Sequence, residues 1–141
     1  MNNNIQKVFP PFNKQFATIL SDLGTILQRK GDPFKARAYK KAEETVYTFE
    51  GDINEVSQLK GKPGIGVAVL KKMQEFVDTG KIEFLEKEKL NPVNVFTQIH
   101  GIGIKKAEKI VEDGIKTIEE LRENQDKLND VQKKGLKYYE D

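Results

Sequence analysis

The chain has 141 residues, of which 37% are hydrophobic and 33% charged, with a net charge of +2 and no cysteine. This composition is typical of a globular protein with one domain or two small ones, and it excludes a disulfide framework and a thiolate metal site. No apolar run approaches the roughly 20 residues that span a bilayer, so no membrane partner is expected.

The first predicted element is an amphipathic helix over residues 13–30. Apolar side chains recur there at spacings of three and four residues, from Phe12 to Leu27, which is the period of one helix face. Gly31 follows the last turn, and glycine is a typical residue for ending a helix. The pattern therefore predicts one long helix with a buried stripe.

A second helix is predicted to begin directly after the first. Asp32 has the position of an N-cap and Pro33 that of the first helical residue. Proline is favoured there because the backbone N–H of that residue makes no hydrogen bond within the helix. Lysines and one arginine cover most of the surface of this helix. Four apolar residues are expected to face inward: Phe34, Ala38, Ala42 and Val46.

Two shorter elements follow. Residues 52–55 have capping-box spacing and predict a short helix that ends at Leu59. A glycine-containing turn then leads into a helix over residues 66–79, which Gly80 closes. The pair is predicted to be two helices joined by a tight turn.

The domain boundary is predicted near residue 90. A short helix over residues 82–89 is broken by Asn91-Pro92, because the residue before a proline is disfavoured in helical conformation. The predicted domains are residues 1–90 and residues 91–141.

The second domain is also predicted to be helical. After a second glycine turn, its outgoing helix ends at Asp113-Gly114, and residues 117–120 and 129–132 are two further helix starts of capping-box form. The last helix is expected to continue to Asp141, which suggests the front part of a longer protein. No period-two strand pattern occurs, so the predicted fold class is all-α, with two small helical domains.

One short element occurs twice, 37 positions apart. Gly64-Ile65-Gly66 and Gly101-Ile102-Gly103 each lie between an apolar helix and a lysine-bearing amphipathic helix. The glycines allow positive φ and leave backbone N–H groups exposed at the next helix's N-terminus, where the helix dipole favours an anion. Such a turn can hold a phosphate without a charged side chain. Two copies predict a unit that binds a phosphate backbone twice.

Charge is distributed unevenly along the chain. Residues 28–42 carry six basic residues against one acid, and residues 56–74 carry four lysines and no acid. Residues 112–130 carry seven acids against three basic residues. We therefore expect a basic side and an acidic side.

Lys72 is a candidate nucleophile on the helix over residues 66–79. At 100° per residue, the apolar face of this helix spans about 120°, and Lys72 lies about 40° beyond its edge, next to Phe76. Lys71 points away from the core. Partial desolvation and the like charge of Lys71 both favour the uncharged amine, which can form a Schiff base with an aldehyde. An ordinary lysine with a buried stem is the alternative.

Several segments resemble family X DNA polymerases, and they occur in the family's order over nearly the whole chain after Asn13. They are PFKARAYKKA at 33–42, PGIG at 63–66, TGK at 79–81, FTQIHGIG at 96–103, DGIKT at 113–117, DKLN at 126–129 and GLKY at 135–138. The resemblance implies an amino-terminal lyase domain and a helical subdomain that grips duplex DNA, each with a helix-hairpin-helix motif. The lyase activity implied is removal of 5′-deoxyribose phosphate during base excision repair, by Schiff-base formation and β-elimination.

The resemblance also implies roles for individual residues. The Schiff-base lysine corresponds to Lys72, and Lys35, Tyr39 and Lys60 match positions that hold the 5′-phosphate or pack near the nucleophile. Further DNA contacts are implied at Gly64, Ile65, Gly66, Lys71, Gly101, Gly103, Lys105 and Lys106. Backbone carbonyls that would bind a monovalent cation, Na⁺ or K⁺, belong to Lys60, Lys62, Ile65, Thr97, Ile99 and Ile102.

The sequence departs from the family at three positions. Phe34 stands where the best-known member has a phosphate-binding histidine, Ala68 replaces a phosphate-binding lysine, and Lys71 replaces a glutamate. The lyase chemistry needs no cofactor. Mg²⁺ would serve only nucleotidyl transfer, which uses a carboxylate triad, and no Asp-x-Asp pair occurs in these 141 residues, so they are not expected to polymerise DNA alone.

Three functions remain open from the sequence. The first is a monomeric 5′-deoxyribose phosphate lyase that binds gapped or nicked double-stranded DNA. The second is a helix-hairpin-helix module that binds DNA without chemistry. The third is a helical protein-binding module that uses the acidic segment from Glu112 to Asp130.

Overall fold

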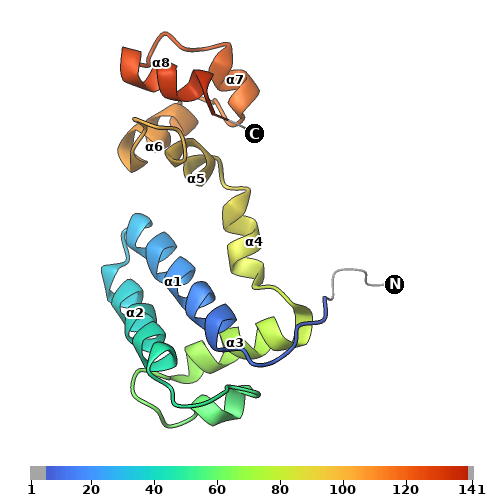
Figure 1. The fold of residues 1–141 in the computed structure, drawn as a ribbon. Helices are drawn as coiled ribbons and strands as arrows, with labels where there is room; N and C mark the ends of the chain where they lie inside the picture. Colours follow the sequence, from blue (N-terminus) through green and yellow to red (C-terminus); the bar gives the residue numbers. More distant parts are fainter. Residues whose placement is uncertain (1–5, 140–141) are drawn as a thin grey trace. The chain divides into compact units, whose positions relative to one another are not determined.

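The computed structural model describes residues 6–139, and every regular element in that part of the chain is helical (Figure 1). The all-α prediction is therefore confirmed. None of the described helices is long and apolar enough to cross a membrane. The elements are α1 (Asn13–Arg29), α2 (Pro33–Tyr47), the 3₁₀ helix η1 (Val56–Leu59), α3 (Val67–Thr79), α4 (Glu83–Lys89), α5 (Pro92–Thr97), α6 (Ile104–Glu112), α7 (Ile118–Arg122) and α8 (Asp130–Lys137).

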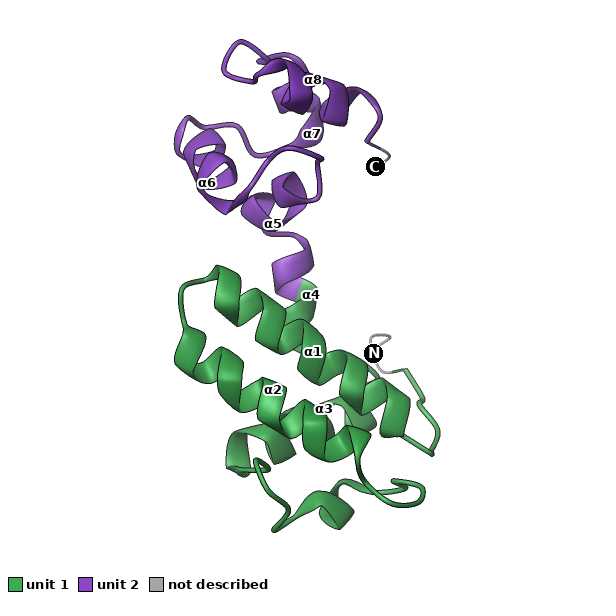
Figure 2. Ribbon diagram, turned by 60° about the vertical axis from the view of Figure 1, so that its left-hand side comes forward, with its two compact units in different colours: residues 1–86 green, residues 87–141 purple. Residues whose placement is uncertain are grey.

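The chain divides into two compact units, residues 1–86 and residues 87–141 (Figure 2). The division falls within α4, a few residues before the predicted boundary. The strongly basic segments lie in the first unit and the acidic segment in the second. We had expected a basic side and an acidic side of one molecule, and the segments belong instead to different units. The first unit carries 13 basic and 11 acidic residues, and the second carries 11 of each.

The core of the first unit is built on α1 and α2, which lie side by side in Figure 1. Phe16 and Leu20 of α1 are fully buried, and each such side chain stabilises the fold by about 1.5–3 kcal/mol. The Phe16 ring meets the Phe76 ring of α3 edge to face, with centroids 6.2 Å apart. The amide oxygen of Asn13 accepts from the Ile53 N–H at 2.8 Å, which holds the loop before η1 against α1.

Helix α2 begins as predicted but buries a different face. The Asp32 carboxylate accepts a hydrogen bond from the Lys35 N–H at 3.1 Å, and Pro33 is the first helical residue. However, Phe34 and Ala38 are exposed, and the buried residues are Ala36, Tyr39, Ala42 and Val46. Repeated steps of four residues drift by about 40° each around a helix, so the predicted stripe could not stay on one face.

The elements around the first turn also differ in one detail from the prediction. The short helix begins at Val56, and its capping box is formed by Glu55 and Gln58, three residues later than the predicted box. Helix α3 follows the prediction, because it starts after Gly66 and ends at Gly80, which has φ +81°.

The second unit has its own apolar core around Phe96, Ile99 and Leu136. The capping boxes predicted at Thr117 and Asn129 are both present. Helix α8 ends at Lys137, with Tyr138 as its C-cap, so the predicted continuation of this helix is wrong at Tyr138 and Tyr139. The last two predicted positions, 140 and 141, lie outside the described residues.

Candidate nucleic-acid interface

The first hairpin turn connects η1 to α3 through two backbone hydrogen bonds. The Lys62 N–H donates to the Leu59 carbonyl, and the Ile65 N–H donates to the Lys62 carbonyl, each at 3.1 Å. Gly64 between them has φ +77°, a region that favours glycine. Ile65 is buried, so its side chain anchors the turn while the backbone stays on the surface.

The second turn, between α5 and α6, repeats this arrangement bond for bond at a spacing of 37 residues. The Ile99 N–H donates to the Phe96 carbonyl at 3.1 Å, and the Ile102 N–H donates to the Ile99 carbonyl at 3.0 Å. Gly101 has φ +90°, and Ile102 is buried. The repeat predicted from the sequence is therefore one structural unit used twice.

Both turns end on a glycine N-cap. Gly66 precedes α3 with φ −97° and Gly103 precedes α6 with φ −90°, and neither helix has a side-chain cap. In four other helices, by contrast, the N-cap side chain accepts a hydrogen bond from a backbone N–H. These N-cap residues are Asp32, Asn91, Thr117 and Asn129. The first N–H groups of α3 and α6 are thus left for an external acceptor.

The fold does not require glycine at either N-cap. A β-carbon on Gly66 or Gly103 would meet no atom within 4 Å, and both φ values are open to any residue. By contrast, a β-carbon on Gly64 would lie 2.6 Å from Cγ of Lys41. Glycine at a position without internal crowding is useful where another molecule approaches the backbone closely.

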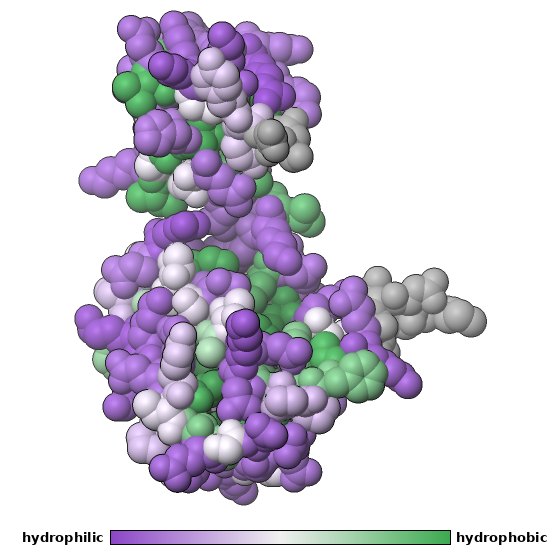
Figure 3. All heavy atoms as spheres, in the orientation of Figure 1, coloured by the Kyte–Doolittle hydropathy of each residue, from purple (hydrophilic) through white to green (hydrophobic). Residues whose placement is uncertain are grey.

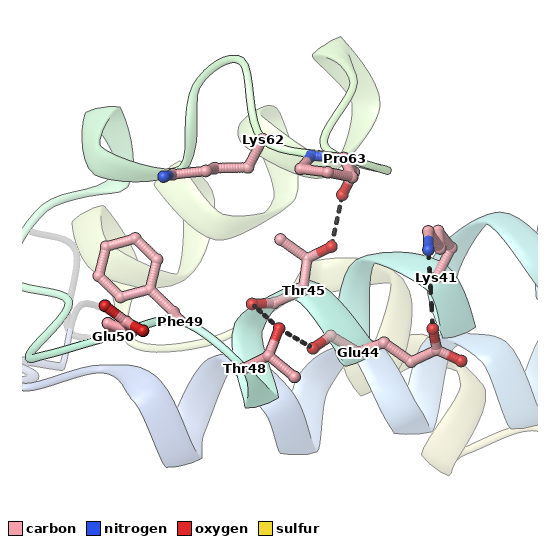
Figure 4. A pocket seen from close by; sticks show the side chains of 8 residues that line it. All are labelled: Lys41, Glu44, Thr45, Thr48, Phe49, Glu50, Lys62 and Pro63. Atoms are coloured by element: carbon pink, nitrogen blue, oxygen red, sulfur yellow. Dashed lines mark hydrogen bonds and ion pairs between the residues drawn. The ribbon is translucent and has the colours of Figure 1, made fainter.

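Helix α2 supports the first turn. The Thr45 hydroxyl donates a hydrogen bond to the Pro63 carbonyl at 2.5 Å, next to a surface pocket of about 690 Å³ (Figure 4). The Lys62 ammonium lies 5.7 Å from the centroid of the Phe49 ring in the same pocket. Lys41, which contacts Gly64, forms an exposed ion pair with Glu44 at 3.8 Å.

Helix α8 supports the second turn through Gln132, a buried polar residue. Its side-chain oxygen accepts from the Asn129 N–H at 3.0 Å, which completes the capping box of α8. Its side-chain nitrogen donates to the Gly101 carbonyl at 2.9 Å. A β-carbon on Gly135 would overlap the backbone of His100, so α8 packs directly on the turn. The sequence indicated only the capping role of Gln132.

Replacing Gln132 should separate these two roles. Gln132→Glu keeps the capping oxygen but loses the donor to the Gly101 carbonyl, and it brings an acceptor toward an acceptor. We expect a loss of about 1–3 kcal/mol in unfolding free energy for the second unit. Glu108→Gln, at an exposed position of α6, is the control and should change stability by less than about 0.5 kcal/mol. Chemical denaturation followed by circular dichroism measures both, and equal stabilities would contradict the bracing role.

Most of the lysines predicted to contact DNA are exposed, as such a role requires: Lys35, Lys60, Lys71 and Lys105. Lys106 is different, because its ammonium donates a hydrogen bond to the Lys127 carbonyl. Tyr39 is buried in the first core, and this burial raises the pKa of its phenol.

An ion pair fixes the loop that Lys106 contacts. The Lys127 ammonium lies 2.6 Å from a carboxylate oxygen of Asp113. This hydrogen bond holds the pKa of Asp113 below its ordinary value and raises that of Lys127. The pair is therefore charged at neutral pH.

Lys72 is half-buried on α3, whereas Lys71 is exposed, as the helical wheel predicts. The aromatic neighbour of the Lys72 ammonium is Phe84 of α4, whose ring centroid lies 5.5 Å away. The Lys30 ammonium, at the end of α1, lies 5.9 Å from the same centroid. Sequence reasoning missed both contacts of the Phe84 ring, because no local pattern brings Phe84 to Lys72 or to Lys30.

Oxygen atoms near the turns could serve as cation ligands. The Lys62 and Ile99 carbonyls each accept one turn hydrogen bond, and a carbonyl oxygen has a second lone pair. Within residues 6–139, no group of three or more histidine or carboxylate side chains is placed to hold a metal ion. Backbone carbonyl oxygens coordinate K⁺ in channel filters, so a neutral carbonyl set fits a monovalent cation in its chemistry.

Comparison with known proteins identifies both hairpin regions. Residues 11–82, just over half of the chain, match the helix-hairpin-helix domain family. Residues 94–141 match the family described as the fingers domain of DNA polymerase lambda. The two matched regions correspond to the two compact units.

Curated relatives agree with these matches. The chain is 37% identical to DNA polymerase lambda of Arabidopsis thaliana over 94% of this chain and 26% of that protein. It is 32% identical to the DNA polymerase type-X family protein pol4 of Schizosaccharomyces pombe, over 92% and 26%. It is 29% identical to the human DNA-directed DNA/RNA polymerase mu, over 79% and 24%. The chain spans about a quarter of the length of these relatives. The chain therefore belongs to the helix-hairpin-helix domain family and to the family X DNA polymerases.

Proposed function

We propose that the chain binds the sugar-phosphate backbone of DNA through the open N–H groups that follow its two hairpin turns. The observation that carries this proposal is the pair Gly66 and Gly103, where nothing inside the protein needs glycine. A phosphate oxygen at either helix N-terminus would accept the uncapped N–H groups and meet the positive end of the helix dipole. Exposed Lys71 and Lys105 follow in the next turn and supply charge.

A monovalent cation belongs to the same proposal. Carbonyls of Lys60, Lys62 and Ile65 in the first turn, and of Thr97, Ile99 and Ile102 in the second, would hold Na⁺ or K⁺ beside the phosphate. The cation would supply positive charge that neutral carbonyls lack. Support comes from the equal hydrogen bonding of the two turns.

We further propose that Lys72 removes a 5′-deoxyribose phosphate from gapped or nicked DNA. Its uncharged amine would attack C1′ of the ring-opened sugar, and loss of water would give a protonated Schiff base. Removal of a C2′ proton would then break the C3′–O bond, so that the DNA leaves with its 5′-phosphate. Water would hydrolyse the imine and regenerate Lys72. Lys35 and Lys60 would hold the sugar's 5′-phosphate.

The surroundings of Lys72 support an accessible amine. No carboxylate lies within 4.0 Å of its ammonium in residues 6–139, so no internal ion pair occupies it. Lys72 is half-buried, so part of its stem is covered while its ammonium lies 5.5 Å from the centroid of the Phe84 ring. The lyase belongs to the first unit alone.

A module that binds DNA without chemistry is the second candidate, and Phe84 favours it. A ring 5.5 Å from the Lys72 ammonium stabilises the charged form by a cation–π interaction. The charged amine is not a nucleophile. Under this reading Lys72 would contribute only positive charge to the DNA surface.

DNA affinity is expected to fall steeply with salt and to be the same for unrelated sequences. If about four exposed lysines contact phosphates, log Kd should change with log salt with a slope of about 3–4, which is about 100-fold between 50 and 200 mM. Phosphates carry no sequence information, so specificity is not expected. Fluorescence anisotropy with two unrelated duplexes measures both effects.

Gapped DNA with a 5′-phosphate is the matched substrate for this titration. We expect it to bind more tightly than an intact duplex of equal length, and equal affinities would contradict recognition of ends.

Replacing K⁺ by tetramethylammonium at constant ionic strength should weaken binding if the carbonyls hold a cation. A flat titration at low salt would contradict the proposal and favour a protein-binding module.

A further inference from the structure

A groove lined by cations lies beside the second half of α8. Its volume is about 640 Å³, and it is lined by Arg122, Lys133, Lys134, Lys137 and Tyr138, with no carboxylate among the described lining residues. This concentration of charge is local, because the second unit has equal numbers of basic and acidic residues. Most of the face seen in Figure 3 is hydrophilic, so polarity by itself does not mark the groove.

The cations come from two helices. Lys133, Lys134 and Lys137 belong to α8, and Arg122 is the last residue of α7. A guanidinium nitrogen of Arg122 donates to the Tyr139 carbonyl at 3.1 Å, which fixes this side chain at the end of α8. Lys134 and Lys137 also complement the dipole of their own helix. Arg122 has the same role at the end of α7, and this role does not account for Lys133.

An exposed aromatic ring borders the groove. Tyr138 is 67% exposed, and the Lys137 ammonium lies 5.5 Å from the centroid of its ring. Tyr138 also lines a second depression of about 800 Å³, together with His100 and Val131. The ring therefore separates a cationic groove from a depression that reaches the second hairpin turn.

We propose that this groove binds an unpaired, single-stranded segment of DNA, with phosphates on its four cations and a base stacked on Tyr138. The proposal rests on the DNA binding proposed above, but it uses side chains instead of the hairpin N–H groups. Positive grooves with exposed aromatic rings are how proteins hold single strands, because every base has a stacking face. A base inside a duplex cannot stack on a side chain, and an acidic peptide would leave the ring without a role.

The test uses the 141-residue chain and a fluorescein-labelled 12-nucleotide oligothymidylate. Tyr138→Ala should raise its Kd about fivefold or more, whereas Tyr138→Phe, which keeps the ring face, should stay within about twofold. Both variants should bind a blunt duplex within about twofold of the unchanged chain. The triple variant Lys133→Ala, Lys134→Ala, Lys137→Ala should lower the salt slope for oligothymidylate by about 2, because each single-strand phosphate contributes about 0.7. Melting curves confirm that the variants fold.

Three results would overturn the assignment. The first is equal oligothymidylate affinity for Tyr138→Ala and the unchanged chain. The second is a loss of affinity in Tyr138→Ala that is as large for the blunt duplex as for oligothymidylate. The third is displacement of the labelled oligothymidylate by polyglutamate as effectively as by unlabelled oligothymidylate. The hairpin proposal is tested separately. The double variant Gly66→Ala, Gly103→Ala should lose duplex affinity. In this background, Tyr138→Ala should still weaken oligothymidylate binding. That weakening would support the groove even if the double variant kept its duplex affinity.

Discussion

Lys72→Ala is expected to abolish the covalent adduct that borohydride traps between the chain and a nicked abasic DNA. Reduction converts the Schiff base into a stable secondary amine, so the adduct reports the nucleophile directly. If Lys72 is the nucleophile, as proposed, its removal should lower trapping by at least about 100-fold, because the amine that forms the imine is lost. Gel electrophoresis of the reduced mixture measures the effect.

A second variant separates charge from nucleophilicity. Lys72→Arg keeps a cation that can lie over the Phe84 ring, but its guanidinium is always protonated and cannot attack. We expect DNA affinity close to that of the unchanged chain and no adduct. Lys14→Ala, an exposed lysine on α1, is the control and should trap normally.

Mapping the trapped peptide completes this test. An adduct that survives in Lys72→Ala, or that maps to another lysine in the unchanged chain, would contradict the assignment. If the unchanged chain forms no adduct while binding gapped DNA, the second candidate function, binding without chemistry, is favoured. The cation–π contact with Phe84 would then be the physical reason.

Local signals predicted the elements of this fold well. Asp32-Pro33, Thr117 with Glu120, and Asn129 with Gln132 each carry their cap within three residues of chain. Such bonds depend only on sequence spacing, so a sequence shows them. The orientation of α2 was harder, because which face is buried depends on its packing against α1 as well as on the residues of α2.

The site was predictable to the extent that it repeats. The repeat of Gly-Ile-Gly in the same sequence context correctly indicated that the two turns have the same backbone conformation, including glycine at both N-caps. The contacts that position the turns join residues far apart in sequence, such as Gln132 with Gly101 and Thr45 with Pro63. Phe84 beside Lys72 is of the same kind. No periodic pattern encodes such pairs, so only the structure shows them.

The two N-cap glycines provide the sharpest test of backbone binding. Gly66→Ala and Gly103→Ala place a methyl group in open space where a phosphate would approach the uncapped N–H groups. A hydrogen bond to a charged group is worth about 1.5–3 kcal/mol, so loss of one at either turn should weaken duplex binding about tenfold or more. The turns belong to separate units, so the effects should add in the double variant to about 100-fold.

The stability of the same variants decides what the affinity loss means. Both φ values suit alanine and no atom lies within 4 Å, so the cost should stay within about 1 kcal/mol, since alanine is a poorer N-cap than glycine. Gly64→Ala is the matched contrast. Its φ of +77° and its contact with Lys41 should cost about 1–2 kcal/mol or more from the left-handed conformation alone. Duplex affinity that stays unchanged in a well-folded Gly66→Ala, Gly103→Ala variant would show that the N–H groups of α3 and α6 hold no phosphate.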